Sequence, residues 1–265
     1  MDIITSRNSR SVIEAIKLKQ KKYRDDCSLF FFEGRKLLAD AARAGVVFKK
    51  IFYTEKNAAF IQSFDIKCEK TPVSESVYEK LSDESSPSGV FCIALHLDNI
   101  KNSGKIIKEE NPVRRSAFTA VSVRDPGNLG TLIRTANAFG VGTLILSSDC
   151  ADVYNPKTVR SSMGALFRQD ILIWERDICA LPAFLSSNGF RTYAAALHKD
   201  SVSLDRMETI SDVCFAVGNE GHGLSDSFIE KCDGTVFIPM EEDSESLNVS
   251  GAAAVLMWES YKSRR

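Results

Sequence analysis

The sequence predicts an α/β protein in which a small α/β domain precedes a larger, mostly parallel sheet with helices on both faces. Short apolar runs alternate with helical segments after residue 116, and a polar, charged stretch at residues 98–116 separates them from the first hundred residues. The length of 265 residues, with 44% apolar and 26% charged side chains, is typical of two globular domains. We expect residues 1–105 to form the first domain, a linker to reach about 115, and residues 116–265 to form the second.

The first domain combines two helical patterns with three apolar runs. Apolar side chains recur at helical spacing in residues 11–22 and again in residues 34–44. Residues 29–32, 48–53 and 90–97 are short apolar runs of the kind that form strands. This mixture indicates a small α/β domain of about 100 residues.

The second domain repeats a strand-then-helix order. Apolar runs predict the strands, and amphipathic segments between them predict the helices. The expected strands are 117–121, 143–146, 171–174, 192–197, 213–217 and 235–238, and the expected helices are 129–139, 156–163, 180–185, 224–230 and 249–261. Ligands of such sheets bind in loops at the carboxyl ends of the strands, so the candidate site is expected there.

Charge, cysteine and histidine usage narrow the classes of function. The formal net charge of -1 gives no evidence for a polyanionic partner, but residues 17–24, KLKQKKYR, hold five cations and a tyrosine. That run is typical of either an RNA-binding segment or a solvated helix face. Seven scattered cysteines and three separated histidines predict reduced thiols and no metal site. The longest apolar run, residues 252–258, is too short to span a bilayer, and the first residues lack a signal-peptide core, so we expect a cytoplasmic protein.

A first polar loop follows the strand expected at residues 117–121. In DPGNLGTLIRTANAFG, Asn128 can cap a new helix, Gly130 allows close backbone approach, and Arg134 lies one turn later on the same face. A helix N-terminus beside a guanidinium forms an anion site, although a capped helix with a surface arginine has the same pattern. A related segment, NPKTVRSSMGALFR, places Lys157, Arg160 and Arg168 around a helix that begins with proline, where they are candidates for phosphate binding.

Two further loops follow later strands. VGNEGHGLS leaves backbone uncovered at its glycines, which suits a flat ligand, and its spacing matches neither a Rossmann loop nor a P-loop. In IPMEEDSESLNVSGAAAVLMWE, Ser246 and Asn248 precede a strongly apolar helix, where capping and catalytic roles are alternatives. That helix is expected to be buried, in the core or against another subunit.

The order of these motifs strongly resembles the SpoU/TrmH family of RNA ribose 2′-O-methyltransferases, which use S-adenosylmethionine (AdoMet). The SRN start, the basic first helix and FFFEGRKLL also resemble the family's substrate-binding domain, which is similar to a small ribosomal protein. The resemblance implies a deep trefoil knot in the second domain, a homodimer and no metal. Glu242 stands where many members have glycine, so the third loop is expected to differ in path or electrostatics.

The resemblance implies roles for the residues that match the family's motifs. Arg134 would polarise the ribose hydroxyl and hold a phosphate, while the residues leave the proton acceptor open. The implied catalytic residues are Arg134, Asn128, Glu220, Ser246 and Asn248, and the implied cofactor pocket comprises Leu197, Gly218, Asn219, Ile238, Met240 and Leu247. The residues expected to bind RNA are Lys17, Lys19, Lys21, Lys22, Arg35, Lys157 and Arg160.

The expected function is therefore AdoMet-dependent methylation of a ribose 2′-hydroxyl in RNA. Large-subunit ribosomal RNA is favoured because an appended domain suits a structured target. The alternatives are a tRNA ribose 2′-O-methyltransferase and a non-catalytic RNA-binding or ribosome-assembly protein with the same fold. The motifs do not identify the nucleotide, because RNA selection depends largely on shape.

Overall fold

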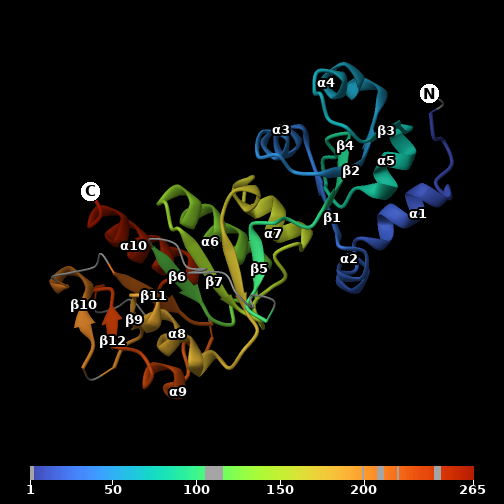
Figure 1. Cartoon of the computed structure of the whole chain (residues 1–265). Coiled ribbons are helices and arrows are strands. Elements are labelled where there is room, and N and C mark those ends of the chain that lie inside the picture. Colours follow the sequence, from blue (N-terminus) through green and yellow to red (C-terminus); the bar gives the residue numbers. More distant parts are fainter. Residues whose placement is uncertain (1–2, 105–115, 199, 208–211, 220, 242–245) are drawn as a thin grey trace.

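A computed structural model describes residues 3–104, 116–198, 200–207, 212–219, 221–241 and 246–265. These residues form two sheets surrounded by helices, the smaller sheet in the N-terminal part and the larger in the C-terminal part (Figure 1). The α/β class is confirmed for both parts. Within the described ranges, no helix has the length and apolar character needed to cross a membrane.

The N-terminal sheet has four strands. In spatial order they are β1 (Leu29–Glu33), β4 (Val90–Leu95), β2 (Phe48–Tyr53) and β3 (Glu69–Pro72). Strand β4 is antiparallel to both neighbours, and β3 is parallel to β2. The helices are α1 (Arg10–Lys17), α2 (Lys21–Cys27), α3 (Arg35–Arg43), α4 (Ala58–Gln62) and α5 (Glu75–Leu81), and η1 (Glu55–Asn57) is a 3-10 turn.

The sequence predicts one helix over residues 11–22, but the structure has two helices there, α1 and α2. The guanidinium of Arg24 donates hydrogen bonds to the carbonyls of Leu18 and Lys19 at 2.7 and 3.0 Å. These carbonyls lie at the end of α1, where backbone acceptors lack helical partners. Arg24 is only 2% exposed as a result, so it is not a cation on an RNA-binding face. This corrects the interpretation of residues 17–24 as a run of five available cations.

The C-terminal sheet has eight strands, and every pairing among them is parallel. In spatial order they are β10 (Val202–Ser203), β12 (Gly234–Phe237), β9 (Arg191–Ala195), β11 (Val213–Val217), β6 (Ala117–Ala120), β7 (Thr143–Ser147), β8 (Ile171–Trp174) and β5 (Ile100–Asn102). Strand β5 lies within the stretch read as polar from the sequence, and it pairs with β8 at the edge of this sheet.

Helices cover both faces of the larger sheet, as the alternation of buried residues requires. Leu144 and Phe215 share a core with the helices of one face, whereas the next residues, Ile145 and Ala216, share a core with those of the other. The first face carries α6 (Pro126–Ala138), α7 (Pro156–Ser161) and α10 (Val249–Lys262), and the second carries α8 (Leu181–Ser187) and α9 (Asp226–Ile229).

The two domains are packed against each other. The rings of Phe32 and Phe167 lie 5.2 Å apart across the junction and belong to one continuous apolar core. Beside them, Nη2 of Arg24 lies 2.5 Å from Oδ2 of Asp152, and both side chains are largely buried. The domain junction therefore holds the N-terminal domain in one orientation relative to the larger sheet.

Candidate functional site

The first candidate loop joins β6 to α6. The carboxylate of Asp125 accepts a hydrogen bond from the backbone N–H of Asn128 at 2.8 Å, so Asp125 caps the helix. The helix therefore begins at Pro126, not at residue 129 as expected, and Asn128 is not its cap. Lys157 donates to the other Asp125 oxygen at 2.7 Å, and this hydrogen bond lowers the pKa of Asp125. The ammonium of Lys157, expected to bind RNA, is thus paired with a carboxylate.

Arg134 lies on the exposed surface of α6. Across the described part of the chain, its guanidinium has no hydrogen-bond or ion-pair partner. Gly130, also on α6, faces the neighbouring helix α7. A Cβ at this position would lie 2.5 Å from the carbonyl oxygen of Thr158. Glycine is therefore required for the close packing of these two helices, as its position in the motif indicated. The packing fixes the position of α6, and Arg134 is exposed on this helix.

The second candidate loop is a tight turn at the end of β11. A Cβ at Gly218 would lie 2.2 Å from the carbonyl carbon of Gly223, so a larger residue would not fit. Asn219 and Gly223 exchange backbone hydrogen bonds of 3.1 and 2.9 Å. The side chain of Asn219 donates to the carbonyl of Ser122 at 2.9 Å and accepts from the N–H of Gly221 at 2.8 Å. This asparagine thereby ties the glycine loop to the end of β6.

The third candidate loop brings Asn248 to the first. Asn248 caps α10, with its oxygen accepting from the N–H of Ser250 at 2.9 Å. Its side-chain nitrogen donates to Oδ1 of Asn128 at 3.3 Å, although the two residues are 120 positions apart. Capping and contact with the first motif therefore occur in the same residue, and the catalytic role expected for Asn248 stays a prediction.

Apolar side chains are exposed at the same edge of the sheet. Strands β12, β9 and β11 are parallel neighbours, so the segments that follow them share one edge. Leu197 follows β9 and is 87% exposed, while Met240 and Leu247 are each 44% exposed. Ile238, directly after β12, is half-buried. Exposed apolar side chains beside an uncovered glycine backbone fit a ligand with both an apolar and a hydrogen-bonding part.

The structure describes Ser246 but neither of the two glutamates expected to matter at the site. Ser246 is exposed just before α10. Glu220 and Glu242 lie outside the described residues, so the orientation role expected for Glu220 and the altered path expected at Glu242 stay predictions. Among the described residues there is no cluster of three or more His, Cys, Asp or Glu side chains suited to a metal ion.

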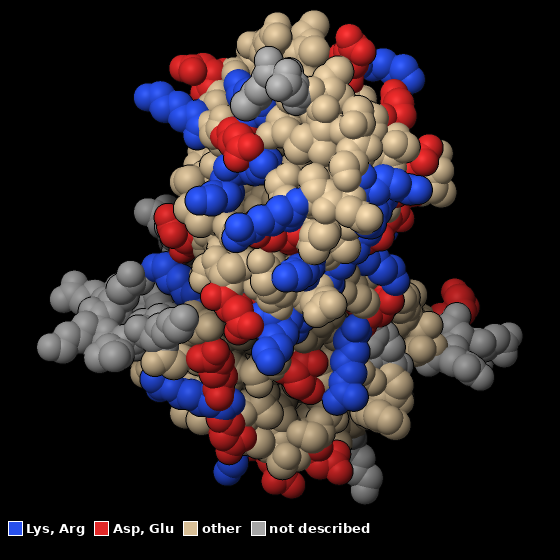
Figure 2. All heavy atoms as spheres, turned by 90° about the vertical axis from the view of Figure 1, so that its right-hand side faces the viewer, with Lys and Arg blue, Asp and Glu red and all other residues tan. Residues whose placement is uncertain are grey.

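Some of the residues expected to bind RNA form ion pairs or ring contacts within the protein, and others are exposed. Lys19 and Lys21 form ion pairs of 2.6 Å with Asp83 and Asp25. The exposed Lys17 lies 5.7 Å from the centre of the Tyr23 ring, and Lys22 is exposed. Lys and Arg side chains gather across the middle of the face in Figure 2, with acidic side chains among them. The guanidinium of Arg35 stacks 4.3 Å from the ring of Phe60, and Arg160 is exposed on α7.

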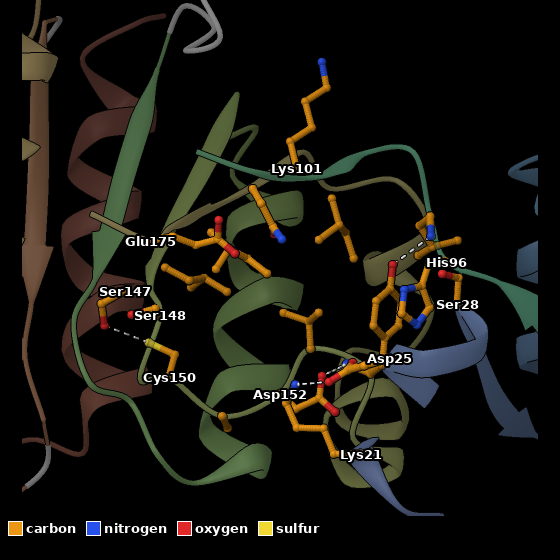
Figure 3. A pocket seen from close by; sticks show the side chains of 18 of the residues that line it. Lys21, Asp25, Ser28, His96, Lys101, Ser147, Ser148, Cys150, Asp152 and Glu175 are labelled. Carbon is orange, nitrogen blue, oxygen red and sulfur yellow. Dashed lines mark hydrogen bonds and ion pairs between the residues drawn. The ribbon is translucent and has the colours of Figure 1, made fainter. Parts of the chain in front are cut away.

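A cavity lies between the domains (Figure 3), and one of its lining residues, Ser147, accepts a hydrogen bond from the N–H of Ser122 in the segment after β6. Its volume is about 1040 Å³, and its lining includes Lys21 and His96 from the first domain and Cys150 and Asp152 from the second. The ring of His96 stacks on Tyr154 at 4.1 Å, and burial lowers the pKa of this histidine. No local pattern in the sequence indicates this cavity, because its walls come from segments far apart in the chain.

Comparison with known proteins bears on both domains. Residues 116–258, more than half of the chain, match the model of the SpoU rRNA Methylase family. The chain belongs to this family. Residues 10–92 match a second model, the MRM3-like substrate binding domain, and lie ahead of the SpoU domain.

Individual relatives of the SpoU protein match over both domains. It is 28% identical to the 23S rRNA (guanosine(2553)-2′-O)-methyltransferase RlmP of Bacillus subtilis, over 97% of this chain and 98% of the relative. It is 30% identical to an uncharacterized tRNA/rRNA methyltransferase of Synechocystis, over 98% and 93%. The AdoMet-bound rRNA methyltransferase of Sinorhizobium meliloti superposes with a TM-score of 0.83 at 26% identity, covering 98% of this chain and 97% of that one.

Replacing Asn248 with alanine tests the contact between the first and third loops of the SpoU domain. The change removes a helix cap and should lower the free energy of unfolding by about 1 kcal/mol. Asn248→Ser keeps a capping oxygen but not the amide that reaches Asn128. Urea unfolding and methyl transfer should therefore separate the two variants, with stability recovered in the serine variant and turnover lowered in both. Full turnover in Asn248→Ala would contradict the site assignment.

Proposed function

We propose that this protein transfers a methyl group from AdoMet to a ribose 2′-hydroxyl of RNA, and that its substrate is large-subunit ribosomal RNA. The observation that carries the proposal is the meeting of the three motif loops at one edge of the sheet, where Asn248 contacts Asn128. The named rRNA methyltransferases that resemble the chain over both domains support ribosomal RNA as the target.

The side chains at this edge are suited to aligning a ribose. When bound, AdoMet supplies the methyl group, and displacement at that group requires in-line alignment of the attacking hydroxyl. Arg134 carries a permanent positive charge, so it polarises the hydroxyl and holds an adjacent phosphate but does not accept the proton. Asn128, held by Asn248, positions the ribose or Arg134, and we assign Glu220 to orient this pair.

The cofactor pocket is assigned to the loops after β9, β11 and β12. Gly218, Ile238 and Leu247 line it, with Leu197, Asn219 and Met240 beside them. The tight turn at Gly218 and the exposed apolar side chains fit a molecule with an adenine ring and a charged tail. We assign Ser246 a hydrogen bond to the nucleotide or to the cofactor carboxylate.

A homodimer is part of the proposal. Trp258 on α10 is 45% exposed, and its ring lies 5.7 Å from that of Phe139 at the end of α6. Exposed aromatic groups of this kind are enriched at protein interfaces. A second copy packed here would cover the helices that carry Arg134 and Asn248. We also propose that the chain is knotted at the cofactor loops and acts in the cytoplasm.

The experiment that tests the proposal is methyl transfer from labelled AdoMet to total RNA from cells lacking this protein, followed by mapping of 2′-O-methyl positions. Label at one nucleotide of ribosomal RNA is the expected result. Label in tRNA would instead favour the tRNA methyltransferase. No label, together with no AdoMet binding by calorimetry, would favour a non-catalytic RNA-binding or assembly protein.

Lysine substitutions in α1 and α2 test RNA binding by the first domain. Replacing Lys17, Lys19, Lys21 and Lys22 by glutamine should weaken RNA binding and flatten its salt dependence. Lys17→Gln/Lys22→Gln should bring the negative slope of log affinity against log salt closer to zero by roughly 1 to 2 units. The matched pair Lys19→Gln/Lys21→Gln, with an equal change in charge, should have less effect because both lysines pair with carboxylates. An unchanged slope in the fourfold variant would make these helices a solvated face.

A further inference from the structure

Ser122 occupies a backbone conformation that serine rarely adopts. Its φ is +55°, in the left-handed region that favours glycine. It stands at the corner where β6 ends and the chain turns toward Asp125 and α6. Strained residues of this kind persist only where surrounding contacts over-determine them.

All three polar groups of Ser122 are engaged. Its N–H donates to Oγ of Ser147 at 2.8 Å, and its hydroxyl donates to Oδ2 of Asp149 at 2.5 Å. Its carbonyl accepts from the side chain of Asn219 at 2.9 Å. Ser147 in turn donates to Oδ1 of Asp149 at 2.6 Å, so one carboxylate receives two hydroxyl hydrogen bonds. Figure 3 shows Ser147 beside Cys150 at the end of β7.

The two sides of the site meet at this corner. Three residues after Ser122, Asp125 caps the helix that carries Asn128 and Arg134. The carbonyl of Ser122 holds Asn219, which shapes the glycine loop. The conformation of Ser122 therefore sets both the start of α6 and the anchoring of the glycine loop.

We propose that Asp149 is a positioning residue for methyl transfer: together with Ser147 it holds Ser122 in the left-handed conformation and so aligns α6 with the glycine loop. This role rests on the proposed methyltransferase function. Asp149 follows β7 and contacts none of the residues assigned to the substrate or cofactor. Besides the two hydroxyls it forms a 3.6 Å ion pair with the exposed Arg124, so it acts through the segment after β6 and chiefly through Ser122. Burial alone would raise the pKa of Asp149, but hydrogen bonds from both hydroxyls and from the backbone, together with the charge of Arg124, lower it.

A double-mutant cycle at Asp149 and Ser122, read out as the rate of methyl transfer, tests this role. Asp149→Ala should lower kcat about tenfold, because a small displacement of aligned groups is costly, and should leave the KM for RNA within about twofold. In Ser122→Gly, glycine adopts the left-handed conformation without help. Ser122→Gly/Asp149→Ala should therefore recover kcat to within about threefold of the wild type. Glu230→Ala removes an exposed carboxylate that has no hydrogen bond or ion pair within the described residues, and it should have no effect.

The outcomes separate a positioning role from a merely structural one. Full kcat in Asp149→Ala, or a loss that the glycine substitution does not recover, would overturn the proposal, as would failure of both variants to fold. Hydrogen exchange gives a readout that does not depend on methyl transfer. Exchange in residues 122–134 and around Asn219 should rise in Asp149→Ala and return in the double variant. If the wild type methylates no RNA, the proposed function fails, while this exchange pattern still decides whether Asp149 holds Ser122.

Discussion

Arg134→Ala is expected to lower the rate of methyl transfer at least about a hundredfold, the effect of removing one group that stabilises developing charge. The same change should leave AdoMet affinity within a few fold, because the cofactor loops follow other strands. Stability should be retained, since Arg134 is exposed and alanine is a strong helix former. Single-turnover transfer of labelled methyl groups to RNA, with calorimetry for AdoMet, measures both quantities.

Two control variants sharpen this result. Arg134→Lys keeps the positive charge but loses the planar fork that binds phosphate through two hydrogen bonds, so only part of the rate should return. Thr135→Ala changes the next residue of α6, whose hydroxyl bonds the Thr131 carbonyl within the helix, and it should leave the rate unchanged. Turnover that survives in Arg134→Ala would make the assignment of this arginine wrong.

Asp152→Ala is expected to have the largest effect on stability, about 3–5 kcal/mol in the free energy of unfolding. Asp152 lies against Arg24, which is 2% exposed, and also accepts from the N–H of Tyr154 at 2.9 Å. Removing the carboxylate leaves a buried guanidinium at the domain junction without its charged partner. Urea unfolding followed by circular dichroism measures the loss.

A partly exposed ion pair within the first domain is the control for Asp152→Ala. Asp83→Ala breaks the pair with Lys19, whose groups are both partly exposed, and should cost less than about 1 kcal/mol. A loss below 1 kcal/mol in Asp152→Ala as well would contradict the view that this buried pair holds the two domains together.

Local patterns explain which parts of the fold the sequence predicts well. Six of the eight strands of the larger sheet and its long helices match the prediction, because apolar periodicity is a signal within a few residues, whereas the short edge strands β5 and β10 are not predicted. Asp125 as the cap of α6 was missed, although an aspartate directly before a helix-starting proline is a known signal for this position. Helix α5 was also missed, although Ser74 caps it and Val77, Tyr78 and Leu81 are buried.

The sequence predicts which residues belong to the motifs, but it does not predict which partners their side chains bind. Lys157 and Arg24 both read as free cations in the sequence, yet one pairs with Asp125 and the other is buried against Asp152. Both acidic partners are distant in sequence: Asp125 is 32 positions from Lys157, and Asp152 is 128 positions from Arg24. A count of charges in a window cannot identify such partners.

The sequence by itself determined the α/β class, the membership in the SpoU family and the residue types of the candidate site, because each depends on patterns within short segments. Only the tertiary structure decided which of these segments meet. Asn248 reaches Asn128 across 120 positions, and Asn219 reaches Ser122 across 97. Such contacts depend on the order of parallel strands in the sheet, which brings distant loops to one edge.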